Sequence, residues 1–296
     1  MQSGSLTKAA AHLRVSHPAV SQVIADLEHA LGVKLFDRSS RGVEPTSYAH
    51  ALLTRGRAAF NELKQGIRDI EFLADPTAGE LTIGYTLSIG DTVLPPIIEQ
   101  FSEKHPRVAM RANIVPTPSF KFPGLHDRTY DLIVTRIPKP IPDDDAMSEL
   151  NVEVLFDDPW VIVACVTSRW ARRRKVDLAE LLDEPWLMPP PDTSSYKIVA
   201  EAFKARGVGM PKATLVTYSM DLRAKLSARG RFITVVPKSV LRHGDDRHAS
   251  KELAVDIPMR PWPVTILTLK NRTLSPVVER FIDCAREIAK TLVKGG

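Results

Sequence analysis

The chain has 296 residues, of which 44% are apolar and 25% are charged, so it has room for two or three ordinary globular domains. No signal peptide and no run approaching the roughly 20 apolar residues of a membrane span is visible, so we expect a cytoplasmic protein. Two cysteines exclude a disulfide framework, and a net charge of +5 agrees with a polyanionic partner without locating its site.

Residues 5–46 predict a short helix, a tight turn, a second helix and a basic hairpin. Apolar residues recur at helical spacing in both predicted helices. Ser16 is a good N-cap for the second helix, Pro18 fits its first turn, and Gly32 is typical of a helix end. This order is that of a winged helix-turn-helix, whose second helix enters the major groove of DNA.

Three stretches of this region form a long ordered motif: GSLTKAA (4–10), VSHPAVSQVIADLEHALGVKLFDR (15–38) and RGVEPT (41–46). They resemble the LysR-type transcriptional regulators, which implies a DNA-binding domain over 1–46. The sequence differs from the family at His17, where a glutamine is usual. About one helix fewer also precedes the motif, so we expect the first helix to be missing and the apolar face of 6–31 to be partly uncovered.

By this resemblance, the start of the second helix lies against DNA. The residues expected to contact DNA there are Ser16, His17, Pro18, Ser21 and Gln22. Gln22 is suited to bond adenine bidentately, and His17 can donate or accept a hydrogen bond. Thr7, Arg38 and Arg41 are expected to contact phosphates, which sets register rather than sequence; Arg41 beside the wing equally suits the minor groove.

Residues 47–75 predict one long helix, because they contain no proline. Apolar or small residues at spacings of three and four form an a/d seam: Leu53, Gly56, Phe60, Leu63, Ile67, Ile70 and Ala74. The segment resembles the family's linker helix, and we expect it to pair two chains. The alternative is a helix that packs on its own domain. Pairing would present two recognition helices to DNA half-sites about one helical turn apart.

The remaining residues, 76–296, show alternating strand and helix patterns, which predict an α/β fold with sheets of the parallel type. Their order resembles the LysR effector domain, a two-lobed α/β domain like the type 2 periplasmic binding proteins. By this resemblance, lobe one would cover about 80–160 and 268–296, and lobe two about 161–267. The predicted fold class is therefore α/β, with a winged helix-turn-helix, a long linker helix and a two-lobed domain.

Ligands of such sheets bind beyond the carboxyl ends of the strands, where polar loops are expected. Four loops fit, including the predicted loop 86–90, and they supply the expected effector-binding residues: Ser88, Thr117, Ser119, Thr135, Arg136 and Thr193. Hydroxyls and free N–H groups at helix starts favour a small anion, with which Arg136 would pair. Each residue is alternatively an ordinary cap or turn. Ser88 and Thr117 lie in loops that the family uses for effector contact.

No catalytic motif accompanies these segments, since GxSxG, HExxH, CxxC and Walker patterns are absent from the sequence. We therefore expect no enzyme activity, no metal and no cofactor. The expected partners are double-stranded operator DNA, a small-molecule effector, and further copies in a homodimer or homotetramer formed through the linker helix and effector domains. RNA polymerase is a further candidate, and a membrane is not expected.

Three rival interpretations stay open. A periplasmic solute-binding protein would explain only the second part of the chain, and it would need a signal peptide. An α/β enzyme fused to a DNA-binding domain would need a catalytic pair in the cleft. A regulator that has lost DNA binding with its first helix is the third.

Overall fold

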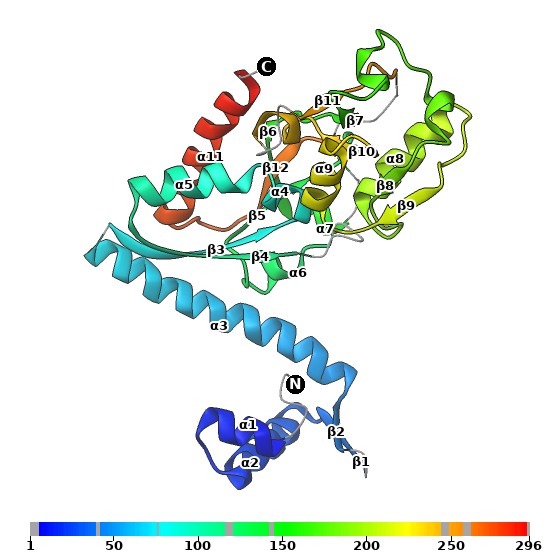
Figure 1. Ribbon diagram of the computed structural model, residues 1–296. Coiled ribbons are helices and arrows are strands. Elements are labelled where there is room, and N and C mark those ends of the chain that lie inside the picture. The colour runs from blue at the N-terminus through cyan, green and yellow to red at the C-terminus, as the bar shows by residue number, and fades with distance from the viewer. Residues whose placement is uncertain are drawn as a thin grey trace. The chain divides into compact units, whose positions relative to one another are not determined.

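The structure is a computed structural model that describes residues 6–39, 42–75, 77–115, 121–141, 145–243, 249–256 and 262–294. It divides into two compact units, Met1–Gly66 and Ile67–Gly296, and each is described by itself. Figure 1 labels the elements in chain order. Among the described helices, none combines the length and the apolar character that crossing a bilayer requires.

The first unit contains two helices, a β-hairpin and the start of a long third helix. The elements are α1 (Leu6–Leu13), α2 (His17–Leu31), β1 (Phe36–Ser39), β2 (Gly42–Pro45) and the first part of α3 (Ser47–Ala74). β1 and β2 pair antiparallel, from Phe36 opposite Pro45 to Ser39 opposite Gly42. The predicted helix-turn-helix and wing are therefore present.

Local chemistry at both ends sets the bounds of α2. The Ser16 hydroxyl accepts a 3.3 Å hydrogen bond from the Ala19 amide, and Pro18 lies in the first turn. Gly32 ends the helix with a φ of 67°, a left-handed conformation that glycine adopts without a Cβ clash. The three sequence signals for this helix are confirmed.

The first unit has a small apolar core, and part of the apolar face of residues 6–31 is exposed. Ala10, Leu35 and Ala49 are buried, whereas α2 has no buried residue. Val20 and Ile24 are half-buried. The large side chains exposed on α1 and α2 or between them are those of Leu13, Val15, Val23, Leu27 and Leu31.

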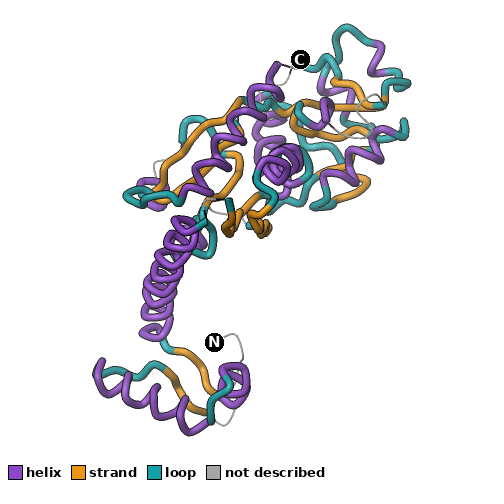
Figure 2. The backbone as a smooth tube through the Cα atoms, turned by 90° about the vertical axis from the view of Figure 1, so that its left-hand side faces the viewer, coloured by secondary structure: helices purple, strands orange, loops and turns teal. Residues whose placement is uncertain are grey.

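The helix α3 is one continuous element of 28 residues, as predicted, and the tube in Figure 2 follows it without a break. Its apolar seam lies open in the single chain. Phe60, Leu63, Ile67 and Ile70 are each more than half exposed, at 60%, 70%, 57% and 68%.

Lobe one of the second unit is built on a five-stranded sheet in the order β4-β3-β5-β12-β6. Its strands are β3 (Ala78–Tyr85), β4 (Arg107–Ile114), β5 (Leu132–Arg136), β6 (Leu150–Phe156) and β12 (Val264–Leu269). Its helices are α4 (Leu87–Gly90), α5 (Leu94–Lys104), α6 (Pro123–His126), α7 (Asp145–Ser148) and α11 (Pro276–Lys294). α5 and α11 lie side by side over this sheet, where Phe101 and Phe281 meet edge to face with ring centroids 5.2 Å apart (Figure 1).

Lobe two is built on a second five-stranded sheet in the order β11-β7-β10-β8-β9. Its strands are β7 (Trp160–Cys165), β8 (Trp186–Met188), β9 (Ala213–Val216), β10 (Ile233–Pro237) and β11 (Ser250–Glu252). Its helices are α8 (Ser194–Ala205), α9 (Met220–Ala228) and α10 (Val240–His243), with short 3-10 turns at Trp170–Arg172 and Leu178–Leu181. Trp186 is fully buried and packs edge to face on Phe203.

The structure differs from the sequence expectations in three places. Residues 87–90 form the short helix α4 rather than a loop, closed by a 2.8 Å bond from the Ile89 amide to the Thr86 carbonyl. The strand β12 lies in the first sheet, so lobe one resumes at about Val264 rather than at about 268. Both sheets are mixed, because β12 and β7 run antiparallel to their neighbours.

Candidate functional site

The first turns of α2 present an exposed polar surface. His17, Pro18 and Gln22 are exposed, and Ser21 is half-buried. The Gln22 amide donates a 2.7 Å hydrogen bond to Asp26 on the same helix, one turn away. The hydrogen bond of Gln22 stays within α2, so this surface is accessible to a binding partner.

Of the other residues expected to contact DNA, the structure describes Thr7 and Ser16 in full and Arg38 only in its backbone. Thr7 is exposed on α1, and Ser16 uses its hydroxyl to cap α2. The backbone of Arg38 lies in β1 opposite Val43. The side chain of Arg38 and the whole of Arg41 fall outside the described residues.

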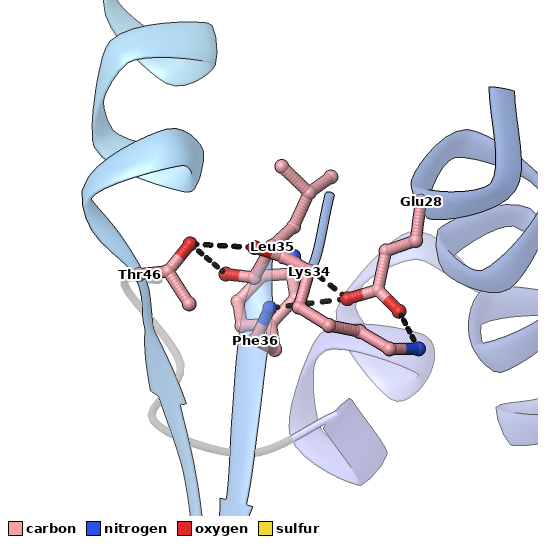
Figure 3. A network of polar contacts seen from close by, with 5 residues as sticks. All are labelled: Glu28, Lys34, Leu35, Phe36 and Thr46. Carbon is pink, nitrogen blue, oxygen red and sulfur yellow. Dashed lines mark hydrogen bonds and ion pairs between the residues drawn. The ribbon is translucent and has the colours of Figure 1, made fainter. Parts of the chain in front are cut away.

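A carboxylate in the last turn of α2 binds the segment that leads into the wing (Figure 3). Glu28 Oε1 accepts hydrogen bonds from the Leu35 amide at 2.8 Å and the Phe36 amide at 3.2 Å, and Oε2 accepts one from Lys34 Nζ at 2.8 Å. The Lys34 and Leu35 hydrogen bonds lower the pKa of Glu28 from 4.5 to about 2. Sequence reasoning missed Glu28, because its partners are backbone amides that no side-chain pattern reveals.

Thr46 ties the same segment to the start of α3. Its Oγ1 donates to the Lys34 carbonyl at 2.8 Å, lies 3.2 Å from the Leu35 carbonyl, and accepts the Ala49 amide as an N-cap (Figure 3). Glu28 and Thr46 therefore hold residues 34–36 from both sides. The recognition helix, the wing and the linker helix meet at this point.

In the second unit, a cavity of about 400 Å³ lies between the two lobes. Four of the predicted effector-binding residues line it: Ser88, Thr135, Arg136 and Thr193. Thr117 and Ser119, the other two, lie outside the described residues. The carboxyl ends of the strands do meet at one place, as the α/β pattern indicates.

The hydroxyls in this group are not equally available. Thr193 caps α8 by accepting the Tyr196 amide and donates to the Pro190 carbonyl at 2.6 Å. Thr135 is 1% exposed, and its carbonyl accepts the Thr265 hydroxyl. Ser88 is half-buried, and its carbonyl accepts the Thr92 hydroxyl at 2.8 Å. Thr193 therefore acts first as a helix cap.

Arg136 connects the cavity to the crossing between the lobes. Its Nη2 donates a 2.7 Å hydrogen bond to Asp158, which lies between β6 and β7, and both side chains are buried. Asp158 in turn accepts the Ser239 amide of lobe two at 2.9 Å. Burial lowers the pKa of Arg136, and the charge of Asp158 opposes that shift.

Sequence reasoning missed a second buried arginine in the cavity. Arg223 of α9 is 2% exposed, and its Nη1 donates to Thr234 Oγ1 at 3.2 Å and the Val235 carbonyl at 3.0 Å. Burial lowers its pKa to about 10, so the guanidinium stays charged at neutral pH. The signal was available, because α9 begins just beyond the carboxyl end of β9, a position like those of the other expected loops.

Two tryptophans of the lobe-two core also line the cavity. Trp160 and Trp262 are 5% and 8% exposed and belong to the lobe-two core, yet both form part of its wall. Apolar side chains from both lobes complete it, including Ile114, Val115, Ile198 and Met220. Within the described part of the chain, no cluster of three His, Cys, Asp or Glu side chains has the arrangement of a metal site.

Family models match both units. The LysR substrate binding domain matches residues 74–290, and the bacterial regulatory helix-turn-helix protein of the lysR family matches residues 1–50. Similar proteins include the HTH-type transcriptional regulator GbpR of Azospirillum brasilense, 24% identical over 98% of this chain and 84% of that protein. TdcA of Escherichia coli is 26% identical over 97% of this chain and 89% of that protein.

Solved structures share the whole fold. Full-length OxyR from Pseudomonas aeruginosa has a TM-score of 0.67 and 21% identity, covering 98% of this chain and 90% of that one. CbnR in complex with its target DNA has a TM-score of 0.54 and 22% identity, covering 97% and 95%. With a helix-turn-helix in one unit, a two-lobed domain in the other and family models matching both, the chain belongs to the LysR family of transcriptional regulators.

Proposed function

We propose that this LysR-family regulator reads its operator with the first turns of α2, using His17, Ser21 and Gln22 at base edges. The observation that carries the proposal is the exposed polar face at the start of α2, a helix that Ser16 caps at its beginning and Gly32 ends. Gln22 can present its amide to adenine once it exchanges its contact with Asp26. Thr7, Arg38 and Arg41 serve as phosphate contacts in this proposal.

The regulator acts as a homodimer or homotetramer in this proposal. The open seam of Phe60, Leu63, Ile67 and Ile70 is an apolar stripe at coiled-coil spacing on a helix of 28 residues. Burying it against a second copy would remove apolar surface from water. A symmetric pair would present two copies of α2 to two half-sites.

The cavity between the lobes takes the effector in this proposal, with Ser88, Thr135 and Arg136 among its contacts. It has the size of a small-molecule site, since such pockets span about 300–1,000 Å³. An effector that binds one lobe arrangement more tightly shifts the population toward it, and only by that difference in affinity. The protein acts on DNA in the cytoplasm by binding rather than by catalysis, and RNA polymerase is a further candidate partner.

The test is binding of the purified protein to a labelled fragment of its own upstream region at two salt concentrations, with unrelated DNA as competitor. Specific binding should fall as salt rises, because phosphate contacts release counterions, and should survive the competitor. Binding that the competitor removes would contradict a sequence-specific regulator.

A further inference from the structure

Two buried arginines line the interlobe cavity, and among the described residues only one of them forms an ion pair with a carboxylate. Arg136 has a direct partner in Asp158, whereas no described carboxylate lies within ion-pair distance of Arg223. The charge of Asp91 acts on Arg223 only from beyond that distance. One buried guanidinium at the cavity wall therefore faces no contacting anion, a costly arrangement unless a ligand supplies one.

Hydrogen-bond donors without partners gather on the same wall. Among the described residues, Arg136 Nε and Nη1, Arg223 Nε, Trp160 Nε1 and Thr86 Oγ1 are buried and have no hydrogen-bond partner. All four side chains line the cavity. Buried polar groups are ordinarily satisfied, and such a cluster of donors is matched by a group with several acceptor lone pairs.

The remaining wall limits the charge and shape of that ligand. Asp192 lies at the cavity and accepts the Tyr218 hydroxyl at 2.6 Å, so an acidic group already stands there and disfavours a second negative charge. Apolar side chains form another part of the wall, namely the indoles of Trp160 and Trp262 together with Ile114, Ile198 and Met220. An aromatic ring of a ligand would pack favourably against these indoles, in an offset-stacked or edge-to-face arrangement.

We propose that the effector is an aromatic monocarboxylate whose carboxylate binds Arg223, with the free donors of Arg136 beside it, and whose ring lies among the two indoles. Two carboxylate oxygens match two guanidinium groups through charge-assisted hydrogen bonds. The ring fills the apolar part of the cavity. This inference rests on the proposed function, because it names the ligand class of the same effector site.

The experiment is calorimetric titration of the full-length protein with benzoate and phenylacetate, each compared with its amide. The amide keeps the ring and loses the charge, so it should bind about tenfold or more weakly. Phthalate adds a second charge and lactate lacks the ring, and both should bind more weakly than benzoate. Equal binding of acid and amide, tighter binding of phthalate or lactate, or no binding of either aryl acid would overturn the inference.

Variants locate the site. Arg223→Gln should lower benzoate affinity about tenfold or more, whereas Lys225→Gln, two positions along the same helix and paired with Asp221 at the surface, should leave it unchanged. Because the substitution also removes the hydrogen bonds of Arg223 to Thr234 and Val235, Ile114→Trp is a second variant that leaves these bonds in place. Ile114 is 52% exposed and lines the cavity, so a larger side chain there should fold and block benzoate.

Operator binding by the same preparations separates this inference from the proposed function. Specific operator binding without aryl acid binding would refute the ligand class and leave the regulator intact. Aryl acid binding without specific operator binding would refute the proposed function instead. Unchanged benzoate binding in folded Arg223→Gln and Ile114→Trp would show that the acid binds elsewhere, which also overturns the inference.

Discussion

Arg136 and Asp158 form an ion pair of 2.7 Å in which the two side chains are 4% and 3% exposed. Asp158 also accepts the Ser239 amide, so one carboxylate joins the end of β5 in lobe one to the segment after β10 in lobe two. Arg136 lines the interlobe cavity, and Asp158 lies at the crossing between the lobes. The geometry of Arg136 toward a ligand therefore depends on Asp158.

Asp158→Asn should destabilise the second unit strongly. Removing one partner of a buried pair leaves an uncompensated charge and typically costs about 3–5 kcal/mol. The measurement is the free energy of unfolding by urea. The control is Asp157→Asn, since Asp157 pairs with Lys139 at the surface, where such a pair contributes about 0–1 kcal/mol. Equal losses of unfolding free energy in the two variants would mean that the buried pair stabilises the protein no more than the surface pair does.

Glu28→Gln should loosen the wing and the linker junction. The amide loses the ion pair with Lys34 and accepts the Leu35 and Phe36 amides less strongly. Hydrogen exchange at residues 34–36 should become faster, and operator affinity should fall. Glu44→Gln on the exposed strand β2 is the control, and it should leave exchange at those amides unchanged.

The same carboxylate predicts a pH dependence. The folded-state pKa of Glu28 is about 2, below its ordinary 4.5, so its contribution to stability is complete above 4.5 and is lost as the pH falls toward 2. Thermal unfolding of the wild type and Glu28→Gln should therefore differ at pH 6 and converge at low pH. A difference that stays constant from neutral to strongly acid pH would contradict this assignment.

Gln22→Ala should relax operator discrimination. Loss of a bidentate contact to one adenine costs about 1–3 kcal/mol at that base pair, and the salt dependence should stay the same because no phosphate contact is lost. Competition between the operator and single-base variants measures the effect. Asp26→Ala is the control, since it removes the acceptor of the Gln22 amide and should preserve discrimination. Unchanged discrimination in Gln22→Ala would rule out this residue as a base reader.

Leu63→Asp should convert the oligomer to smaller species. Leu63 is 70% exposed in the single chain, so the substitution leaves the monomer's own packing intact and places a charge in the proposed seam. Light scattering measures the mass. Arg57→Asp, on an exposed position of the same helix outside the seam, is the control and should keep the wild-type mass. A Leu63→Asp protein of wild-type mass would mean that α3 is not the pairing surface.

Much of the first unit follows from sequence because its signals are local. Ser16, Pro18 and Gly32 act within a turn of α2, and the absence of proline from 47–75 lets α3 continue as one helix. The two glycines inside that helix do not interrupt it. That Ser88, Thr135, Arg136 and Thr193 lie together at one cavity could also be predicted, because the ends of strands in an α/β fold meet at a common edge.

The order of helices and strands, the family motif and the sheet edge at which the cavity lies can therefore be predicted from the sequence, since each depends on residues within a few positions of one another. The sequence did not reveal that β12 belongs to lobe one, that Asp158 pairs with Arg136, or that Arg223 and two core tryptophans share a cavity. These are contacts between segments far apart in the chain, such as Thr135 and Thr265, 130 positions apart. Which buried donors find partners depends on how those segments pack, and no local pattern records it.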